Sequence, residues 1–149
     1  MQPLDKWDKR FVEISKVISK WSKDPSRQIG AIAVRNRKIL STGYNGFPKG
    51  IEDTEARLRV REIKYQYVVH AEMNCIYNAS WNGVSLDEAD LFVYGLPVCH
   101  ECAKAIIQVG IRRVIGPYNP DWPKKWQESF DLTKQFFAEA GVKSELVKY

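Results

Sequence analysis

The sequence predicts an α/β fold, a three-layer α/β/α sandwich built on a mixed sheet of about five strands. Amphipathic helical patterns alternate with short apolar runs of strand length, and no repeat, linker or low-complexity segment interrupts them. With 149 residues, 44% of them hydrophobic, the chain is long enough for one substantial core but not for two. We therefore expect a single domain over residues 1–149, with helices on both faces of the sheet.

The N-terminal half begins with a helix and continues with two strands. Apolar residues spaced by four and three positions predict the helix, which ends before Asp24-Pro25. These residues are Trp7, Phe11, Ile14, Ile18 and Trp21. Apolar runs at 29–34 and 39–44 flank a polar turn and predict an antiparallel pair. Residues 50–66 are highly charged and predict a solvated loop and helix.

The C-terminal half alternates helices and strands. The patterns predict helices over 68–81 and 100–109, strands over 91–96 and 112–115, a last helix that contains residues 126–137 and ends near Gly141, and an edge strand over 142–147. The strand, helix, strand order predicts parallel pairing with a right-handed crossover.

Composition limits the classes of function. The 23 basic and 18 acidic residues give a net charge of +5, which suits RNA or a phosphorylated small molecule, or simply a solvated surface. No apolar stretch reaches the length of a signal peptide core or a membrane span, so we expect a soluble, cytoplasmic protein. Three cysteines are too few for a secreted disulfide framework.

The most informative motifs are His70-Ala71-Glu72 and Cys99-His100-Glu101-Cys102, each at a predicted helix start. His70, Cys99 and Cys102 supply three zinc ligands and leave a fourth position for water, which is typical of catalytic zinc. Two thiolates neutralise Zn²⁺ and weaken its effect on water, so a neighbouring base is needed. Glu72 is the expected proton carrier. The positive ends of both helices favour the thiolates.

Other interpretations of these cysteines remain open. A C-x-x-C pair alone fits a redox motif or half of a structural zinc site. His100 is a competing ligand, although at a helix start we expect it to face solvent or a neighbouring subunit. Cys75 lies five residues after His70, about 140° around a helix, so we expect a small core residue that points away from the metal.

Taken together, the motifs resemble the zinc cytidine and deoxycytidylate deaminase superfamily, whose signature is H-x-E with P-C-x-x-C. Four further segments look most like deoxycytidylate deaminases, which convert dCMP to dUMP and ammonia. These segments are Ser22-Lys23-Asp24-Pro25, Gln28-Ile29-Gly30-Ala31, Gly43-Tyr44-Asn45-Gly46 and Glu101-Cys102-Ala103-Lys104. Val98 replaces the proline of the signature, which leaves the rigidity of that loop open.

The resemblance implies one catalytic zinc per chain and a nucleotide that contacts Asn45 and Ala71, with Asn45 on the sugar hydroxyl; an Asn-Gly turn is the alternative interpretation. Ser26 and Arg27 are candidates for the substrate phosphate because a guanidinium binds phosphate oxygens as a fork. Tyr118, in a proline-rich loop, is a candidate for stacking on the base, or else an exposed tyrosine.

The resemblance also implies regulation, with dCTP as activator and dTTP as inhibitor, in a homo-oligomer that is often a hexamer. The candidate effector residues are Gly43, Tyr44, Gly46 and Lys49, and Mg²⁺ would accompany a bound triphosphate. The basic residues between positions 49 and 61 are candidates for contact with the triphosphate, and a solvated charged helix is the alternative interpretation of them.

Two rival functions use the same motifs. A polynucleotide or tRNA deaminase shares the zinc chemistry, and the +5 charge permits it, although the nucleotide-type segments make binding of nucleic acid the less favoured prediction. A non-catalytic zinc-stabilised interaction module would need a fourth protein ligand, for which His100 is the obvious nearby histidine.

Overall fold

The computed structural model describes residues 4–148, in which five strands form one mixed sheet in the order β2-β1-β3-β4-β5. The strands are β1 (Gly30–Arg35), β2 (Lys38–Tyr44), β3 (Asp90–Tyr94), β4 (Arg113–Pro117) and β5 (Lys143–Val147). β1 runs antiparallel to both of its neighbours, whereas β3, β4 and β5 run parallel to one another. The prediction of a mixed, five-stranded sheet is confirmed.

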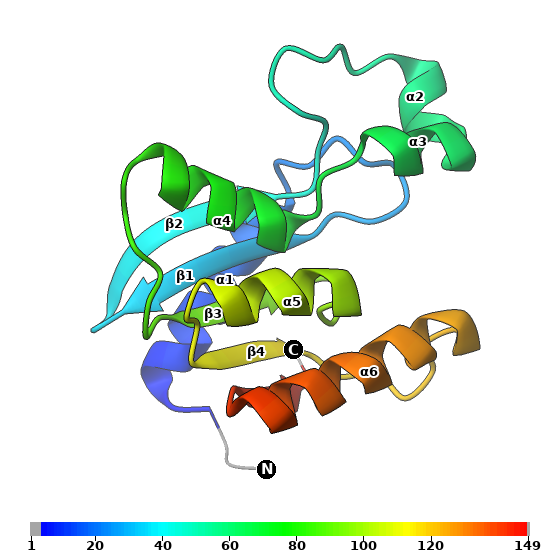
Figure 1. The fold of residues 1–149 in the computed structure, drawn as a ribbon. Helices are drawn as coiled ribbons and strands as arrows, with labels where there is room; N and C mark the ends of the chain where they lie inside the picture. The colour runs from blue at the N-terminus through cyan, green and yellow to red at the C-terminus, as the bar shows by residue number, and fades with distance from the viewer. Residues whose placement is uncertain (1–3, 149) are drawn as a thin grey trace.

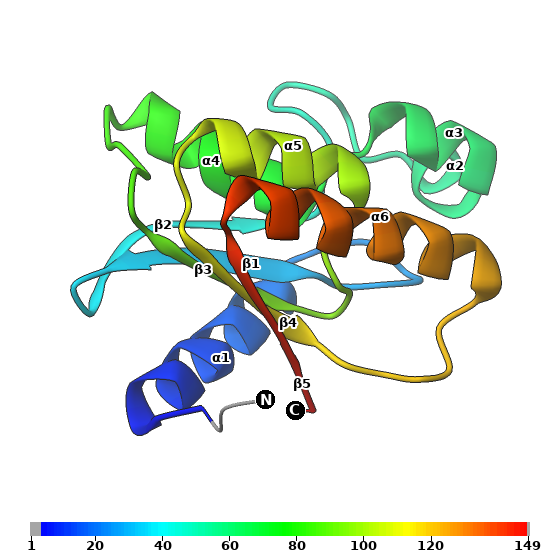
Figure 2. The ribbon, with the colours of Figure 1, turned by 60° about the horizontal axis from the view of Figure 1, so that its bottom comes forward.

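Helices cover both faces of this sheet, as predicted. They are α1 (Lys6–Ser19), α2 (Glu55–Arg59), α3 (Arg61–Tyr67), α4 (Ala71–Trp81), α5 (His100–Gln108) and α6 (Lys124–Ala140). α1 lies alone on one face, and α4, α5 and α6 lie on the other (Figure 2). The core is therefore double: Phe11 of α1 packs on Ile32 and Phe92 on one side, and a larger cluster fills the other.

Local sequence explains the hairpin, and long-range pairing changes one helix boundary. Asn36 and Arg37 both have positive φ, the turn geometry that matches the twist of a two-residue hairpin. The helix predicted over 68–81 begins instead at Ala71. Val69 exchanges two backbone hydrogen bonds with Gly46, 2.8 and 3.1 Å long, so the chain is still extended at that point.

The segment between β2 and α4 leaves the sheet. It carries α2 and α3, which pack mainly against each other and lie away from the strands (Figure 1). The charged stretch predicted as loop and helix thus forms two short helices. No helix within residues 4–148 is long and apolar enough to cross a membrane.

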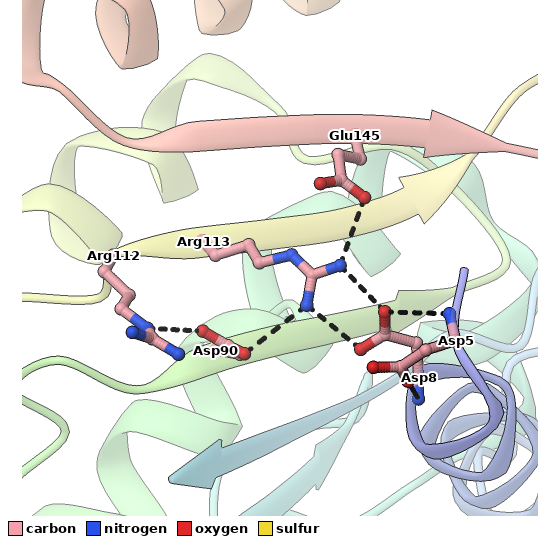
Figure 3. A network of polar contacts seen from close by, with 6 residues as sticks. All are labelled: Asp5, Asp8, Asp90, Arg112, Arg113 and Glu145. Carbon is pink, nitrogen blue, oxygen red and sulfur yellow. Dashed lines mark hydrogen bonds and ion pairs between the residues drawn. The ribbon is translucent and has the colours of Figure 1, made fainter. Parts of the chain in front are cut away.

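A network of ion pairs joins α1 to the strands (Figure 3). Arg113 of β4 donates two hydrogen bonds to the Asp8 carboxylate, 2.9 and 3.0 Å long, and one of 3.1 Å to Glu145 of β5. Its guanidinium also lies 3.5 Å from Asp90 at the start of β3. One side chain therefore links three strands to the first turn of α1.

Candidate active site

Three potential metal ligands meet where α4 and α5 begin. His70 and Cys99 are the residues immediately before these helices, and Cys102 lies in the first turn of α5. Nδ1 of His70 is 3.5 Å from Sγ of Cys99 and 3.3 Å from Sγ of Cys102. Ligand atoms arranged tetrahedrally around zinc lie about 3.3–3.8 Å apart, so the spacing fits this ion. Within residues 4–148 no fourth His, Cys, Asp or Glu side chain joins the group.

The surroundings of the two cysteines favour different protonation states. A hydrogen bond from Cys102, together with one from His70, lowers the pKa of Cys99 and favours its thiolate. The pKa of Cys102 is raised in turn, because its hydrogen bond to Cys99 and its burial favour the thiol. A bound divalent cation would remove this opposition and hold both sulfurs as thiolates.

Glu72 lies in the first turn of α4 and lines the same cavity as His70. Its side chain is buried, and burial raises the pKa of Glu72 to about 7, against the lowering effect of His70. A carboxyl group that titrates near neutral pH can both accept and return a proton, as general acid–base catalysis requires.

The cavity has a volume of about 670 Å³ and is lined by His70, Glu72 and Cys99. Ser26 and Arg27, predicted to contact a phosphate, line it as well. Their backbone N–H groups donate to the Asp24 carboxylate, 2.8 and 3.2 Å away. This loop, fixed by Asp24, therefore shares one cavity with the predicted metal site.

Asn45 also lines the cavity, but its carboxamide already has two backbone partners. Its oxygen accepts from the N–H of Ile29, 2.9 Å away, and its nitrogen donates to the carbonyl of Arg27, also at 2.9 Å. Asn45 thus fastens the end of β2 to the loop before β1. One amide N–H and one oxygen lone pair remain for a ligand.

Two other predicted substrate residues lie outside the cavity lining. Tyr118 instead lines a neighbouring hollow of about 700 Å³, which shares Ser26 and Arg27 with the cavity. Ala71 is completely buried at the start of α4, so its methyl group faces the core.

The four candidate effector residues do not gather at one cavity. Gly43 is a packing residue, because a Cβ there would lie 2.3 Å from the backbone nitrogen of Cys75 in α4. Tyr44 and Gly46 line a small hollow of about 120 Å³. The Lys49 ammonium lies 3.9 Å from the ring centroid of Trp81.

The remaining cysteine and histidine have partners of their own. Cys75 is buried, 3.2 Å from the hydroxyl of Ser41, and burial raises the pKa of its thiol to about 12. Nδ1 of His100 is 2.8 Å from the hydroxyl of Ser129 in α6. His100 is half-buried there, a contact between α5 and α6 that the sequence did not suggest.

Two hydroxyl groups of α6 hold the loop around Val98. Thr133 donates to the carbonyl of Val98 at 2.9 Å, and Ser129 accepts from the backbone N–H of His100 at 3.0 Å. Val98 and His100 flank Cys99, which is a predicted metal ligand. The loop that lacks the proline is therefore fixed by hydrogen bonds from the neighbouring helix.

Several cavity residues were missed by sequence reasoning. Arg61 and Lys64 of α3 and Lys125 and Trp126 of α6 all line the cavity. The charged stretch over 50–66 contained candidates for a triphosphate, but nothing in its pattern separated Arg61 and Lys64, which line the cavity, from its other cations. The only available signal was the overall excess of positive charge.

Comparisons agree with this geometry. The cytidine and deoxycytidylate deaminase zinc-binding region matches residues 5–116. The chain is 39% identical over 140 residues to an uncharacterized deaminase in the luxG 3′ region of Aliivibrio fischeri, covering 93% of this chain and 92% of that protein. It is 39% identical over 115 residues to the deoxycytidylate deaminase of Homo sapiens, covering 73% and 63%. It therefore spans less than two thirds of the human enzyme.

A solved structure resembles the whole fold. The crystal structure of dCMP deaminase from the cyanophage S-TIM5, in complex with dCMP and dUMP, aligns with a TM-score of 0.75 and 25% identity. The alignment covers 99% of both chains. The likeness thus includes the segment that carries α2 and α3.

Proposed function

Because this chain belongs to the cytidine and deoxycytidylate deaminase zinc-binding family, we propose that it hydrolyses dCMP to dUMP and ammonia with one catalytic zinc. The observation that carries the proposal is the meeting of His70, Cys99 and Cys102 beside the buried Glu72, in a cavity large enough for a mononucleotide. The resemblance to a dCMP deaminase solved with dCMP and dUMP supports the choice of substrate.

The chain's own residues account for the proton transfers. Zinc bound by the three ligands would supply the Lewis acidity that makes water a nucleophile near neutral pH. Glu72 takes a proton from the attacking water and delivers it to N3 of the base. It then transfers the second proton to the amino group on C4, so that a C4–O bond forms, the C4–N bond breaks and ammonia leaves.

The absence of a fourth side-chain ligand within residues 4–148 favours this reaction over a closed structural zinc site. His100, the candidate for that position, has its Nδ1 at the hydroxyl of Ser129 instead. Asn45 retains hydrogen-bonding capacity toward the sugar hydroxyl of the substrate.

The direct test is deamination by the zinc-loaded protein, measured as the absorbance change and ammonia release on dCMP, deoxycytidine and single-stranded RNA. We expect dCMP to have the highest kcat/KM. Turnover of RNA or deoxycytidine with dCMP left untouched would overturn the proposed substrate.

Regulation by dCTP and dTTP, with Mg²⁺ accompanying the triphosphate, is a finer proposal. It rests on the resemblance of the segment over residues 43–46 to the corresponding segment of deoxycytidylate deaminases. Asp24 and Asp53 also line the small hollow beside Tyr44. Their carboxylates are paired with Lys64 and Lys23, so a Mg²⁺ ion bound there would have to displace both cations. dCMP turnover measured with each effector, and with and without Mg²⁺, tests it. Sedimentation velocity, with and without each effector, tests the proposed homo-oligomer. We also propose that the protein acts in the cytoplasm and supplies dUMP for thymidylate synthesis.

A further inference from the structure

Three cations from distant parts of the chain line the cavity that holds His70 and Glu72. Arg27 comes from the loop before β1, Arg61 from α3 and Lys125 from the first turn of α6. Each therefore reaches the cavity from a separate segment, and only the folded chain brings the three together.

These three cations carry charge that no carboxylate neutralises. Within residues 4–148 none of them forms an ion pair, and the cavity lining holds only two carboxylates. Glu72 is one, buried next to His70, and Asp24 is the other. The Asp24 carboxylate is already paired with Lys64, 3.1 Å away. The wall of the cavity thus has a positive surplus that suits a dianion.

The pair between Lys64 and Asp24 is buried, and only about a tenth of either side chain is exposed. Asp24 also accepts from the backbone N–H groups of Ser26 and Arg27. One carboxylate oxygen therefore fixes the loop that carries Arg27 and, through Lys64, the helix that carries Arg61. Such a pair contributes little net stability but sets the geometry of what it joins.

Two tryptophans constrain the guanidinium of Arg27. It lies 4.7 Å from the ring centroid of Trp126 and 5.3 Å from that of Trp122. Trp126 lines the cavity beside Lys125. Stacking on aromatic rings leaves the N–H groups at the edge of a guanidinium free to donate to an anion.

We propose that Arg27, Arg61 and Lys125 bind the 5′-phosphate of the substrate, and that Lys64, held by Asp24, is the positioning residue that sets Arg27 and Arg61 at the right separation. The inference rests on the proposed function, which supplies the nucleotide. It makes the protein selective for a nucleoside monophosphate over the nucleoside, because the phosphate carries nearly two negative charges at neutral pH.

The test compares matched arginines and lysines. Arg61→Ala and Lys125→Ala should each raise KM for dCMP roughly 10- to 100-fold, the effect of losing a charge-assisted hydrogen bond, while kcat changes little. Arg59→Ala and Lys124→Ala are the controls, because neither residue lines the cavity. None of the four changes should alter kcat/KM for deoxycytidine.

Lys64 needs a test that a merely structural residue would fail. Lys64→Met should raise KM for dCMP without changing kcat/KM for deoxycytidine. Lys64→Arg should retain most of the wild-type affinity for dCMP. Equal loss on both substrates would overturn the positioning role. Should Lys64→Met not fold, the surface variants of Arg61 and Lys125 still decide the assignment of the phosphate.

Binding of the product separates this inference from the proposed function. Calorimetry measures the binding of dUMP and of deoxyuridine without any turnover. Arg61→Ala should weaken the binding of dUMP and leave the binding of deoxyuridine unchanged. A protein that deaminates nothing yet binds dUMP in an Arg61-dependent way would refute the function and support the phosphate site. If the Arg59→Ala and Arg61→Ala variants deaminate dCMP equally well, the proposed function is supported and the phosphate site is refuted.

Discussion

Glu72 is the residue on which the proposed chemistry depends most. Glu72→Gln keeps the size of the side chain but removes its ability to accept a proton, so turnover of dCMP should fall roughly 10²- to 10⁴-fold. Zinc content, measured by metal analysis, should stay at one ion per chain. Glu101→Gln is the control, since Glu101 is exposed and pairs with Lys104 on the surface. Loss of zinc from Glu72→Gln would show that Glu72 acts as a ligand.

At this scale the sequence was informative where the chemistry is local. C-x-x-C and H-x-E place their groups within one helical turn, so His70, Cys99 and Cys102 could be named before their distances were known. Of the cavity cations, only Arg27 was a candidate for the phosphate before the structure was known. The place of Lys64 could not be predicted, because it meets Asp24 across 40 positions of the chain. No local pattern encodes a partner that tertiary structure supplies.

β2 and α4 approach each other closely at Gly43, and this contact should be sensitive to a single methyl group. In Gly43→Ala the Cβ would meet backbone atoms of Ala71 and Cys75 at 2.5 and 2.3 Å, so α4 must shift. We expect a loss of roughly 1–3 kcal/mol in unfolding free energy, and weaker zinc binding, because α4 follows His70. Gly46→Ala is the matched control, since its nearest neighbouring atom would be 3.9 Å away. Equal stability of the two variants, in denaturant titrations, would contradict this packing.

α6 supports α5 through hydroxyl groups, and the contribution of Thr133 can be isolated. Thr133→Val is nearly isosteric but leaves the buried carbonyl of Val98 without its donor, at a cost of about 1–3 kcal/mol. Zinc should then dissociate faster in chelator competition, because Cys99 follows Val98. Thr133→Ser should behave like the wild type. An unchanged chelator rate for Thr133→Val would mean that the loop is rigid without this bond.

Elements were predictable from hydrophobic periodicity wherever one face is buried. α1 and the sheet were found in this way, whereas α2 and α3 have no continuous apolar stripe and were predicted only as charged loop and helix. The start of α4 was misplaced because Val68 and Val69 read as helical, although Val69 pairs with Gly46, 23 positions earlier. β-branched valines favour extended backbone, so their propensity agrees with the bridge, and the error came from continuing the apolar helical pattern too far toward the N-terminus.

The whole molecule depends on the network around Arg113. Arg113→Met removes one cation and leaves three carboxylates facing one another, so unfolding free energy should fall by about 2–3 kcal/mol. Denaturant titration of the metal-loaded protein measures this loss. Zinc stoichiometry should be unchanged, because none of these residues lines the cavity. Arg112→Met, which breaks one exposed contact with Asp90, should cost less than about 1 kcal/mol. A comparable loss in both variants would contradict the central role of Arg113.

The arrangement of α2 and α3 divides the molecule into two parts that can vary independently. The proposed reaction centre lies on α4 and α5, whose buried faces belong to the main core, so most changes there would disturb folding as well as chemistry. The excursion over residues 47–69 packs mainly against itself and meets the cavity through a few side chains. A library confined to the exposed positions of this excursion should therefore yield folded, zinc-binding proteins with altered substrate choice. The same division would allow related proteins to evolve new nucleotide preferences through changes in this excursion while the predicted metal site stays the same.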